Sequence, residues 1–582
     1  MKILGIHAGH ESGAALIQDG KVTHAIAEER LLRNKLIVNA PTASIKWVLE
    51  YSGLKPSDID VIAVSVLDLK RHFAAEGLFW RKKAAFTKGR SLLEFEYTKD
   101  KKLERVTGPL AVVFNLLAIT GLPRYMLLHA KTMLYIKFCL PGFKGKVLLV
   151  DHHDAHVSSA YFTSGKKEAL SVVSEGMDGR NTFKIDSVND GVMKRIATTP
   201  FPHSPGTFYS VITKMLGFNP VIHAGKVTGL AAYGDPKKAY DKVSKLMWTE
   251  GNELRCSPKL YELEVESSKK GEYPDYFKGH TREDLSAAFQ QRFEDCIVSL
   301  VSNAVKETGM CDLVLSGGCH ANVKLNQRVA EIEGVKSVFV HPCMGDGGLA
   351  VGSALYAANT LNGKRGSYEL NDVYFGPEYG DLEVENALKK FGLEYTRPDD
   401  IEEKIAEILA DHKIVARYWG RMEYGPRALG NRSILYHCKD NTVNDWLNEK
   451  LDRTEFMPFA PAVMSEHADK LFIDVKGKEY TSKFMTITFD CTDWMKETCP
   501  AVVHIDGTAR PQFVDAKCSP HFYRIIKLYY EKTGIPVVLN TSYNIHNEPI
   551  VCTPEDALRA FCSSKLDYLA IGNYLVSSDA LK

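Results

Sequence analysis

Two histidines four residues apart are the first side chains in this chain that could do chemistry. His152 and His156 lie in the stretch 151–156, directly after an apolar run, 145–150, that is typical of a β-strand. Residues 155–162 are typical of the start of a helix, and on a helix positions four apart share one face. Two neutral imidazoles at that spacing can hold one divalent metal ion. Histidines that cap a helix or pack in the core would show the same spacing, so a metal site is indicated only if further ligands are found.

Carboxylates that follow two later strands are candidates for those ligands. An expected strand, 169–174, ends at Glu175, and Asp178 stands slightly further on. A second expected strand, 338–340, leads to Asp346, which lies between glycines that let the backbone approach a ligand closely. We expect Asp346 to bind a metal or a nucleotide-bound metal, with Glu175 and Asp178 as rivals for one further position.

The first turn of the chain places another histidine at the end of a strand. His10 follows the expected strand 2–6, where a side chain faces a cleft, and a plain turn histidine fits this position equally well. Further on, residues 28–30 are all charged, and Arg33 and Lys35 follow them. A run of charges of this kind usually forms a solvated rim, which is our expectation here.

Two glycine-framed turns are candidates for binding phosphate. Residues 224–234 are typical of a helix start from which Lys226 could reach a phosphate, although the order of a P-loop is absent. The expected strand 312–316 runs directly into Gly317 and Gly318 and then into a helix. That arrangement is typical of a turn that approaches adenosine or phosphate.

The second half of the chain concentrates arginines in a glycine-rich turn. Arg421, Arg427 and Arg432 lie in the stretch 420–433, together with three glycines and a proline. Guanidinium groups match phosphate oxygens in pairs, so anion binding is favoured over a plain surface turn. Further polar candidates in this half are Arg453, Arg510, Asn540 and Ser542.

Composition narrows the class of protein. The chain has 582 residues, enough for two to four domains, and its 73 basic and 72 acidic side chains nearly cancel. This balance gives no electrostatic reason to expect nucleic acid as a partner. The 12 cysteines form no Cys-x-x-Cys pair and no signal peptide opens the chain, so we expect a cytoplasmic protein with reduced thiols.

One long segment of the first half has an unusual composition. Residues 70–105 carry 11 basic and 5 acidic side chains interleaved with aromatic ones, and residues 106–122 carry no charge. The uncharged run is short for a membrane span and contains Gly108 and Pro109, so we expect a buried helical insertion and no span. A surface for a membrane or for an amphiphilic acceptor is the alternative. The polar residues 362–367 are the expected linker between the two halves.

The motifs of both halves, taken in order, resemble one enzyme family. They are HHDAH, SGGCHANVKLNQRV, MGDGGLAVGSALY, GRMEYGPRALGNRSIL, HIDGTARPQ, VVLNTSYN and EPIVCTPEDAL. With them the sequence resembles, nearly end to end, the O-carbamoyltransferases of the NodU/CmcH type. The resemblance implies an α/β chain with an N-terminal actin-like domain of the duplicated RNase H type over residues 1–365, carrying a helical insertion at about 66–145. A YrdC-like α/β domain would follow over residues 366–582.

The resemblance also implies a two-step reaction. The second domain would use carbamoyl phosphate and ATP, with magnesium, to form carbamoyl-adenylate. The first domain, holding iron beside a nucleotide, would pass the carbamoyl group to a hydroxyl of a small natural-product or sugar-like acceptor. Carbamoyl-adenylate is a mixed anhydride whose formation requires two polyanions to be held together, which agrees with clustered arginines. A homodimer is left open.

The family's functional positions give expected roles to individual residues. The metal ligands would be His152, His156, Asp346 and, where the family usually has an aspartate, Glu175. The N-terminal nucleotide site would include Lys226, Gly317, Gly318 and Asn322. The C-terminal site for carbamoyl phosphate and ATP would include Arg421, Arg427, Arg432, Arg453, Arg510, Asn540 and Ser542. His10 would take the proton of the acceptor hydroxyl, and Lys35 would lie near the nucleotide. Met457 stands where many members have an arginine, which leaves the detailed phosphate contacts open.

Two other functions compete with this interpretation. One is a tRNA-modifying enzyme that transfers a threonylcarbamoyl group, and both the balanced charge and the motif at 420–433 argue against it. The other is an actin-like ATPase or sugar kinase acting as a switch, which would not need carbamoyl phosphate.

Overall fold

The computed structural model describes residues 1–38, 40–66, 135–136, 138–178, 181–267, 274–363, 366–451, 459–545, 547–564 and 566–581, without the side chains of residues 177, 178 and 362. The insertion with its uncharged run, Arg453, Met457 and the side chain of Asp178 therefore lie outside the described residues. Within the described residues, no helix is long and apolar enough to cross a membrane.

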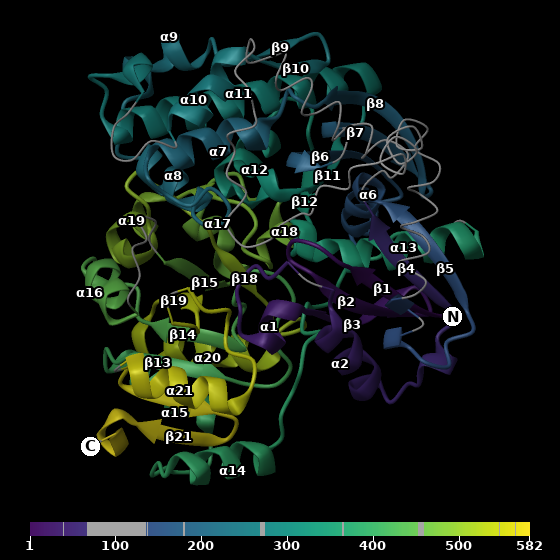
Figure 1. Ribbon diagram of the computed structural model, residues 1–582. Coiled ribbons are helices and arrows are strands. Elements are labelled where there is room, and N and C mark those ends of the chain that lie inside the picture. Colours follow the sequence, from purple (N-terminus) through teal and green to yellow (C-terminus); the bar gives the residue numbers. More distant parts are fainter. Residues whose placement is uncertain are drawn as a thin grey trace, which may run out of the picture.

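The first half of the chain contains two five-stranded sheets with the same strand order (Figure 1). In each sheet three consecutive strands form an antiparallel meander, and two later strands continue the sheet parallel to the first of them. The first sheet has the order β3-β2-β1-β4-β5, with β1 (Lys2–His7), β2 (Gly13–Gln18), β3 (Lys21–Ala27), β4 (Val61–Val66) and β5 (Lys146–Asp151). The second has the order β8-β7-β6-β11-β12, with β6 (Glu168–Asp178), β7 (Asn181–Asn189), β8 (Val192–Pro200), β11 (Asp312–Ser316) and β12 (Ser337–Val340).

Two helices pack against each other and join these sheets. Helix α6 (His152–Phe162) follows the first sheet but packs on β6 and β11 of the second, whereas α13 (Leu349–Asn362) follows the second sheet and packs on β1, β2 and β4 of the first. The close packing of α13 on β1 and on α6 depends on two glycines. A Cβ atom on Gly5 would overlap the carbonyl oxygen of Ala350, and one on Gly352 would overlap that of Ala155. Each sheet therefore receives the helix that leaves the other.

Further helices surround the second sheet on the side away from the first. Helix α11 contacts α7, α8 and α12, and α7 in turn contacts α10 and β6. These helices are α7 (Pro205–Met215), α8 (Ala224–Ala231), α10 (Pro258–Glu266), α11 (Arg282–Thr308) and α12 (Val323–Ala330). They form the upper part of the molecule in Figure 1.

The second half of the chain is built on a mixed seven-stranded sheet of the order β18-β15-β19-β14-β13-β20-β21. Its strands are β13 (Val415–Tyr418), β14 (Arg432–Tyr436), β15 (Ala460–Met464), β18 (Gln512–Val514), β19 (Val537–Ser542), β20 (Tyr568–Ile571) and β21 (Tyr574–Ser577). Helices α15 (Ile401–Ala410) and α20 (Pro520–Thr533) pack together, as do α14 (Asp381–Phe391) and α21 (Pro554–Ser564). The fold as a whole is α/β, as expected.

The two halves share their hydrophobic cores. Met422 and Ala428 pack in one cluster with residues of the first sheet, and Tyr424 and Leu429 pack in another with α6 and α13. A main-chain hydrogen bond also joins the halves: the Val338 N–H on the edge strand β12 donates to the carbonyl oxygen of Gly477 (3.2 Å). The described residues before and after the expected linker, 362–367, therefore pack on one another, although they belong to different sheets.

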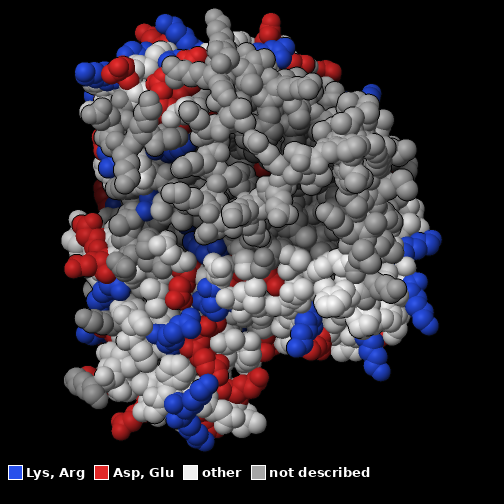
Figure 2. All heavy atoms as spheres, viewed as in Figure 1, with Lys and Arg blue, Asp and Glu red and all other residues white. Residues whose placement is uncertain are grey.

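The charged run near the N-terminus is mostly buried, which contradicts the expected solvated rim. It forms α1 (Glu28–Leu32), in which Glu28 is fully buried and Arg30 is only 7% exposed. The cause is tertiary packing that the local sequence cannot indicate, because Glu28 accepts from the start of α2 (Thr42–Ser52) and Arg30 donates to Gly425 in the second half. Lys and Arg are interspersed with Asp and Glu over the lower part of the face drawn in Figure 2, in agreement with the balanced composition.

Candidate functional site

Helix α6 brings the two histidines together. The helix begins at His152, earlier than the expected start, and the side chain of Asp151 caps it by accepting from the N–H groups of His153 (3.0 Å) and Asp154 (3.2 Å). His152 and His156 are both buried, and their Nε2 atoms lie 3.1 Å apart. Two polar nitrogens that face each other inside the protein require a shared partner.

Two carboxylates converge on the same point. The Nε2 atom of His156 lies 3.1 Å from Oε1 of Glu175 and 3.5 Å from Oδ1 of Asp346, and Nε2 of His152 lies 3.5 Å from the same Asp346 oxygen. One ligand atom from each of the four side chains lies within 4.8 Å of all the others. Ligands at about 2.1 Å from a metal ion stand about 3.0–3.4 Å from their neighbours, so this donor set fits one metal ion. The structure thus brings together the four ligands expected from the sequence.

The histidines and carboxylates of this group change each other's pKa values. Burial alone would lower the pKa of His156, but its contacts with Asp346 and Glu175 raise that pKa above the usual value. Burial alone would raise the pKa of Asp346, but His152 and His156 hold it well below its usual range. Without a metal ion these carboxylates therefore favour a proton on the histidines, and a bound metal would replace that proton.

Two further polar residues near this group were not found from the sequence. His7, at the end of β1, has Nδ1 2.6 Å from Ser65 Oγ and Nε2 2.9 Å from the carbonyl oxygen of His10, and burial lowers its pKa to about 4. Glu11 accepts from the Gly347 N–H (3.1 Å), next to the metal ligand Asp346, and burial with the nearby Asp346 charge raises its pKa to about 7. Their only signal was a cluster of polar residues directly after an apolar strand.

His10 has an imidazole nitrogen without a hydrogen-bond partner among the described residues. It is half-buried at the turn after β1, and its Nε2 atom is buried without a hydrogen-bond partner among the described residues. Its main chain is fixed through His7, whose ring centroid lies 6.3 Å from that of His152. His10 therefore stands close to the metal group with an unsatisfied polar atom.

The expected nucleotide turn is connected to the metal group. Gly318 N–H donates to Glu175 Oε1 (2.6 Å), and Gly317 N–H donates to the carbonyl oxygen of Met344 (2.7 Å), on the loop that leads to Asp346. Asn322 instead serves the fold, because its side chain caps α12 at Leu325 (3.1 Å).

The two expected nucleotide lysines lie in different surroundings. Lys226 is buried on α8, with its Nζ atom 5.5 Å from the ring centroid of Phe218. Lys35 is exposed on the loop after α1.

The arginine-rich turn, residues 419–432, is organised around a buried carboxylate. Glu423 Oε1 accepts from the N–H groups of Leu429 (2.9 Å), Asn431 (2.7 Å) and Arg432 (2.9 Å). Glu423 is only 5% exposed, so these three hydrogen bonds stabilise its charge and fix the turn. The sequence pattern drew attention to the arginines and missed this residue.

Two of the three arginines of this turn are committed to main-chain carbonyls. Arg432 donates to the carbonyl oxygens of four residues and stacks on the ring of Tyr418, whose centroid lies 3.7 Å from the guanidinium carbon. Arg421 donates to the carbonyl oxygens of Gly376 and Phe375 and, across to the first half, of Thr23. Both geometries fit structural roles better than phosphate binding.

Arg427 differs from its two neighbours. Its side chain forms no hydrogen bond or ion pair with the described residues, and burial lowers its pKa to about 10. No carboxylate contributes to that change. A half-buried guanidinium in this state is suited to receive an anion.

The other expected residues of the second half lie close to the same sheet. Asn540 on β19 donates to the carbonyl oxygen of Ala428 (3.2 Å) and to Gln512 Oε1 (2.9 Å), while its own Oδ1 is buried without a partner. Arg510 lines a pocket of about 270 Å³ with His504 and Thr508. Ser542 is half-buried at the end of β19, and Arg453 lies outside the described residues.

Comparison with known proteins gives matches over nearly the whole chain. The family model "Carbamoyltransferase N-terminus" matches residues 2–355, and "Carbamoyltransferase C-terminus" matches residues 406–578. Nodulation protein NolNO of Sinorhizobium fredii is 32% identical over 578 residues, which covers 97% of this chain and 79% of that protein. The 3'-hydroxymethylcephem-O-carbamoyltransferase of Streptomyces clavuligerus is 27% identical over 392 residues, which covers 64% of this chain and 69% of that enzyme.

Among solved structures, the full-length HypF in its phosphate- and nucleotide-bound form aligns with a TM-score of 0.32 and 16% identity. That alignment covers 63% of this chain and 47% of HypF.

The metal group generates a first prediction. Full-length protein purified without oxygen should contain about one metal ion per chain by elemental analysis, as expected for a single four-ligand site. The variant His152→Ala/His156→Ala should lose that metal because it removes half of the donors. His153→Gln is the matched control, since His153 lies on the same helix but outside the group. Equal metal content in all three proteins would refute the site.

The arginine-rich turn generates a second prediction, about stability. Arg432→Met leaves buried carbonyl oxygens without donors, so we expect the free energy of unfolding to fall by about 3 kcal/mol or more. Arg427→Met removes a half-buried charge that has no carboxylate partner in the described part of the chain, so stability should stay the same or rise. Urea unfolding of the two variants measures the difference. Equal losses would contradict the division into structural and binding arginines.

Proposed function

Because the chain belongs to the carbamoyltransferase family, we propose that it is an ATP-dependent O-carbamoyltransferase with one site in each half. In the C-terminal half water cleaves carbamoyl phosphate to carbamate and phosphate, and a carbamate oxygen then attacks the α-phosphorus of ATP to form carbamoyl-adenylate and release pyrophosphate. The N-terminal half transfers the carbamoyl group to a hydroxyl of a small natural-product or sugar-like molecule. The observation that carries this proposal is the buried metal-binding group, which the Gly318 N–H connects to a glycine turn and beside which His10 stands.

The architecture supports this division of labour. Two sheets of one strand order support an actin-like fold of the duplicated RNase H type for residues 1–365. Residues 366–582, with a sheet of their own, correspond to the YrdC-like domain. The shared cores keep the two sites in one body.

The first step depends on binding two polyanions. Arg427 and Arg510 hold phosphate groups of carbamoyl phosphate and of magnesium-bound ATP, with Arg453, Asn540 and Ser542 completing the site. Arg421 and Arg432 shape the turn that presents Arg427, because their guanidinium groups bind main-chain carbonyls. The half-buried guanidinium of Arg427 gains a strong partner when an anion enters, which favours binding.

The metal is proposed to be iron, held by two imidazoles and two carboxylates. A bound cation of this kind would act as a Lewis acid toward a carbonyl or phosphoryl oxygen. Glu175 has a second role, since its Oε1 atom also accepts from Gly318. The metal ligands and the glycine turn therefore orient each other.

His10 takes the proton in the second step. The acceptor oxygen attacks the carbamoyl carbon, the bond from that carbon to the AMP oxygen breaks, and the hydroxyl proton moves to the free imidazole nitrogen. AMP leaves as the second product. Lys226, Lys35, Gly317 and Gly318 bind the nucleotide in this half, and Asn322 supports the helix that follows them.

The surroundings of the reaction follow from its substrates. ATP and carbamoyl phosphate place the enzyme in the cytoplasm, and the balanced charge fits a small-molecule acceptor and no nucleic acid. A homodimer is compatible with this function and is not required by it.

The function itself is tested with labelled carbamoyl phosphate and ATP. Full-length protein should release AMP and pyrophosphate only when carbamoyl phosphate is present, and a panel of hydroxylated metabolites should identify the molecule that becomes labelled. Release of ADP and phosphate without carbamoyl phosphate would instead indicate the actin-like ATPase or kinase.

His10→Asn should separate the two steps. Transfer to an acceptor found in that panel should slow by roughly 10²–10⁴-fold, the usual contribution of a general base. Exchange of labelled pyrophosphate into ATP, which reports the first step, should continue because the residues of that step lie in the other half. His280→Asn, at a half-buried position in the loop before α11, is the control and should behave as the wild type. If both steps fell together in a folded protein, His10 would bind nucleotide or support the structure instead.

A further inference from the structure

Helix α1 is held firmly by its own half of the chain. Glu28 accepts from the N–H groups of Ala43 (2.9 Å) and Ser44 (2.7 Å) at the start of α2 (Thr42–Ser52), and Glu29 accepts from the Leu36 N–H (2.9 Å). These bonds fix both the helix and the loop after it, which carries Lys35.

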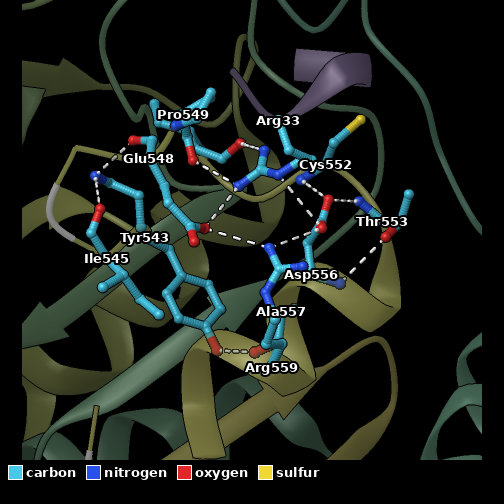
Figure 3. Close-up of polar contacts among 12 residues, drawn as sticks. Arg33, Tyr543, Ile545, Glu548, Pro549, Cys552, Thr553, Asp556, Ala557 and Arg559 are labelled. Carbon is cyan, nitrogen blue, oxygen red and sulfur yellow. Dashed lines mark hydrogen bonds and ion pairs between the residues drawn. The ribbon is translucent and has the colours of Figure 1, made fainter. Parts of the chain in front are cut away.

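The arginines of the same segment reach into the other half. Arg33 ends α1 in a left-handed conformation, with φ of 57°, and donates to the carbonyl oxygens of Ile550 and Pro549, both at 2.7 Å. It also forms ion pairs with Asp556 (3.3 Å) and Glu548 (3.5 Å), as Figure 3 shows. Arg30 donates to the carbonyl oxygen of Gly425 in the arginine-rich turn (3.0 Å).

The residues that receive Arg33 are connected to the arginine-rich turn. Asp556 uses its other oxygen to accept from the N–H groups of Cys552 (3.2 Å) and Thr553 (3.1 Å). The carbonyl oxygen of Cys552 accepts from the hydroxyl of Tyr418 (2.8 Å), the ring on which Arg432 stacks. A continuous series of contacts thus runs from the loop of Lys35 to the turn that presents Arg427.

A second arginine in this cluster provides a matched comparison. Arg559 contacts the same two carboxylates, Glu548 at 3.3 Å and Asp556 at 3.2 Å. It belongs to α21 of the second half and its side chain is 48% exposed, whereas that of Arg33 is 17% exposed. Arg33 and Arg559 therefore share ion-pair partners, but of the two only Arg33 joins the halves.

We propose that Arg33 is a positioning residue that holds the N-terminal half against the C-terminal half, so that carbamoyl-adenylate passes from one site to the other without meeting bulk water. This inference rests on the function proposed above. The guanidinium is suited to the task because a fork of donors can fix two carbonyl groups and two carboxylates at once. Lysine has one compact ammonium group and would retain the charge but lose this geometry.

Loss of the contact has a chemical consequence that can be measured without an acceptor. Escaped carbamoyl-adenylate is attacked by water at its carbonyl carbon, the bond to the AMP oxygen breaks, and carbamate and AMP result. In the intact enzyme the intermediate stays enclosed and returns to ATP when pyrophosphate is supplied. Net AMP release therefore reports escape, and exchange of labelled pyrophosphate into ATP reports formation of the intermediate.

The experiment compares full-length wild type, Arg33→Met, Arg33→Lys and Arg559→Met, with carbamoyl phosphate and ATP and no acceptor. In Arg33→Met we expect net AMP release to rise about tenfold relative to pyrophosphate exchange, since small displacements of a site change rates by up to about 10²-fold. For Arg33→Lys we expect a ratio of AMP release to pyrophosphate exchange between those of the wild type and Arg33→Met. For Arg559→Met we expect the ratio of the wild type. A merely structural role would lower both activities together and leave their ratio unchanged.

Each outcome decides between the two proposals. If the wild type shows no exchange that depends on carbamoyl phosphate, the proposed function fails. If it shows exchange but the ratio is unchanged in Arg33→Met, or changes equally in Arg559→Met, the role of Arg33 is refuted. If Arg33→Met does not fold, Arg33→Lys with the charge retained carries the test, and an unchanged ratio there refutes the role as well.

Discussion

The close crossing of α6 and α13 is the constraint on which the rest of the N-terminal half depends. Gly352 allows it, because a side chain there would overlap the carbonyl oxygen of Ala155 on α6, and Gly5 on β1 lets α13 approach the first sheet closely. Each helix leaves one sheet and packs on the other. The two histidines at the start of α6 therefore lie close to Asp346, just before α13, where the two sheets meet. The metal group forms there because each helix packs on the sheet that it does not follow.

The hydrogen-bond partners of the charged residues in the arginine-rich turn distinguish those that stabilise the fold from the one that could bind a ligand. Glu423 and Arg432 are both buried, and both have several main-chain partners. Arg427 lies between them in the same turn, yet its side chain has no hydrogen-bond or ion-pair partner in the described part of the chain. Burying an unpaired charge is unfavourable, so a protein that retains one gains the energy back when an anion binds.

The local sequence pattern was sufficient to predict much of the fold and part of the candidate site. The strand 312–316 was predicted with its observed bounds, because it is a short apolar run that ends at two glycines. The i, i+4 histidines and the glycine-framed Asp346 also follow from local chemistry. Burial by distant segments could not be predicted in this way, which is why α1 was expected on the surface and why His7 and Glu11 were missed.

The interface between the halves combines two kinds of contact with different consequences. Apolar side chains such as Met422 and Ala428 supply non-directional attraction, which tolerates small shifts. The guanidinium groups of Arg30, Arg33 and Arg421 bind main-chain carbonyls across the interface, and such bonds are sensitive to distance and angle. Buried ionic contacts often add little to stability, but they select one arrangement among several of similar packing. An enzyme that hands an unstable intermediate from one half to the other needs that single arrangement more than it needs additional stability.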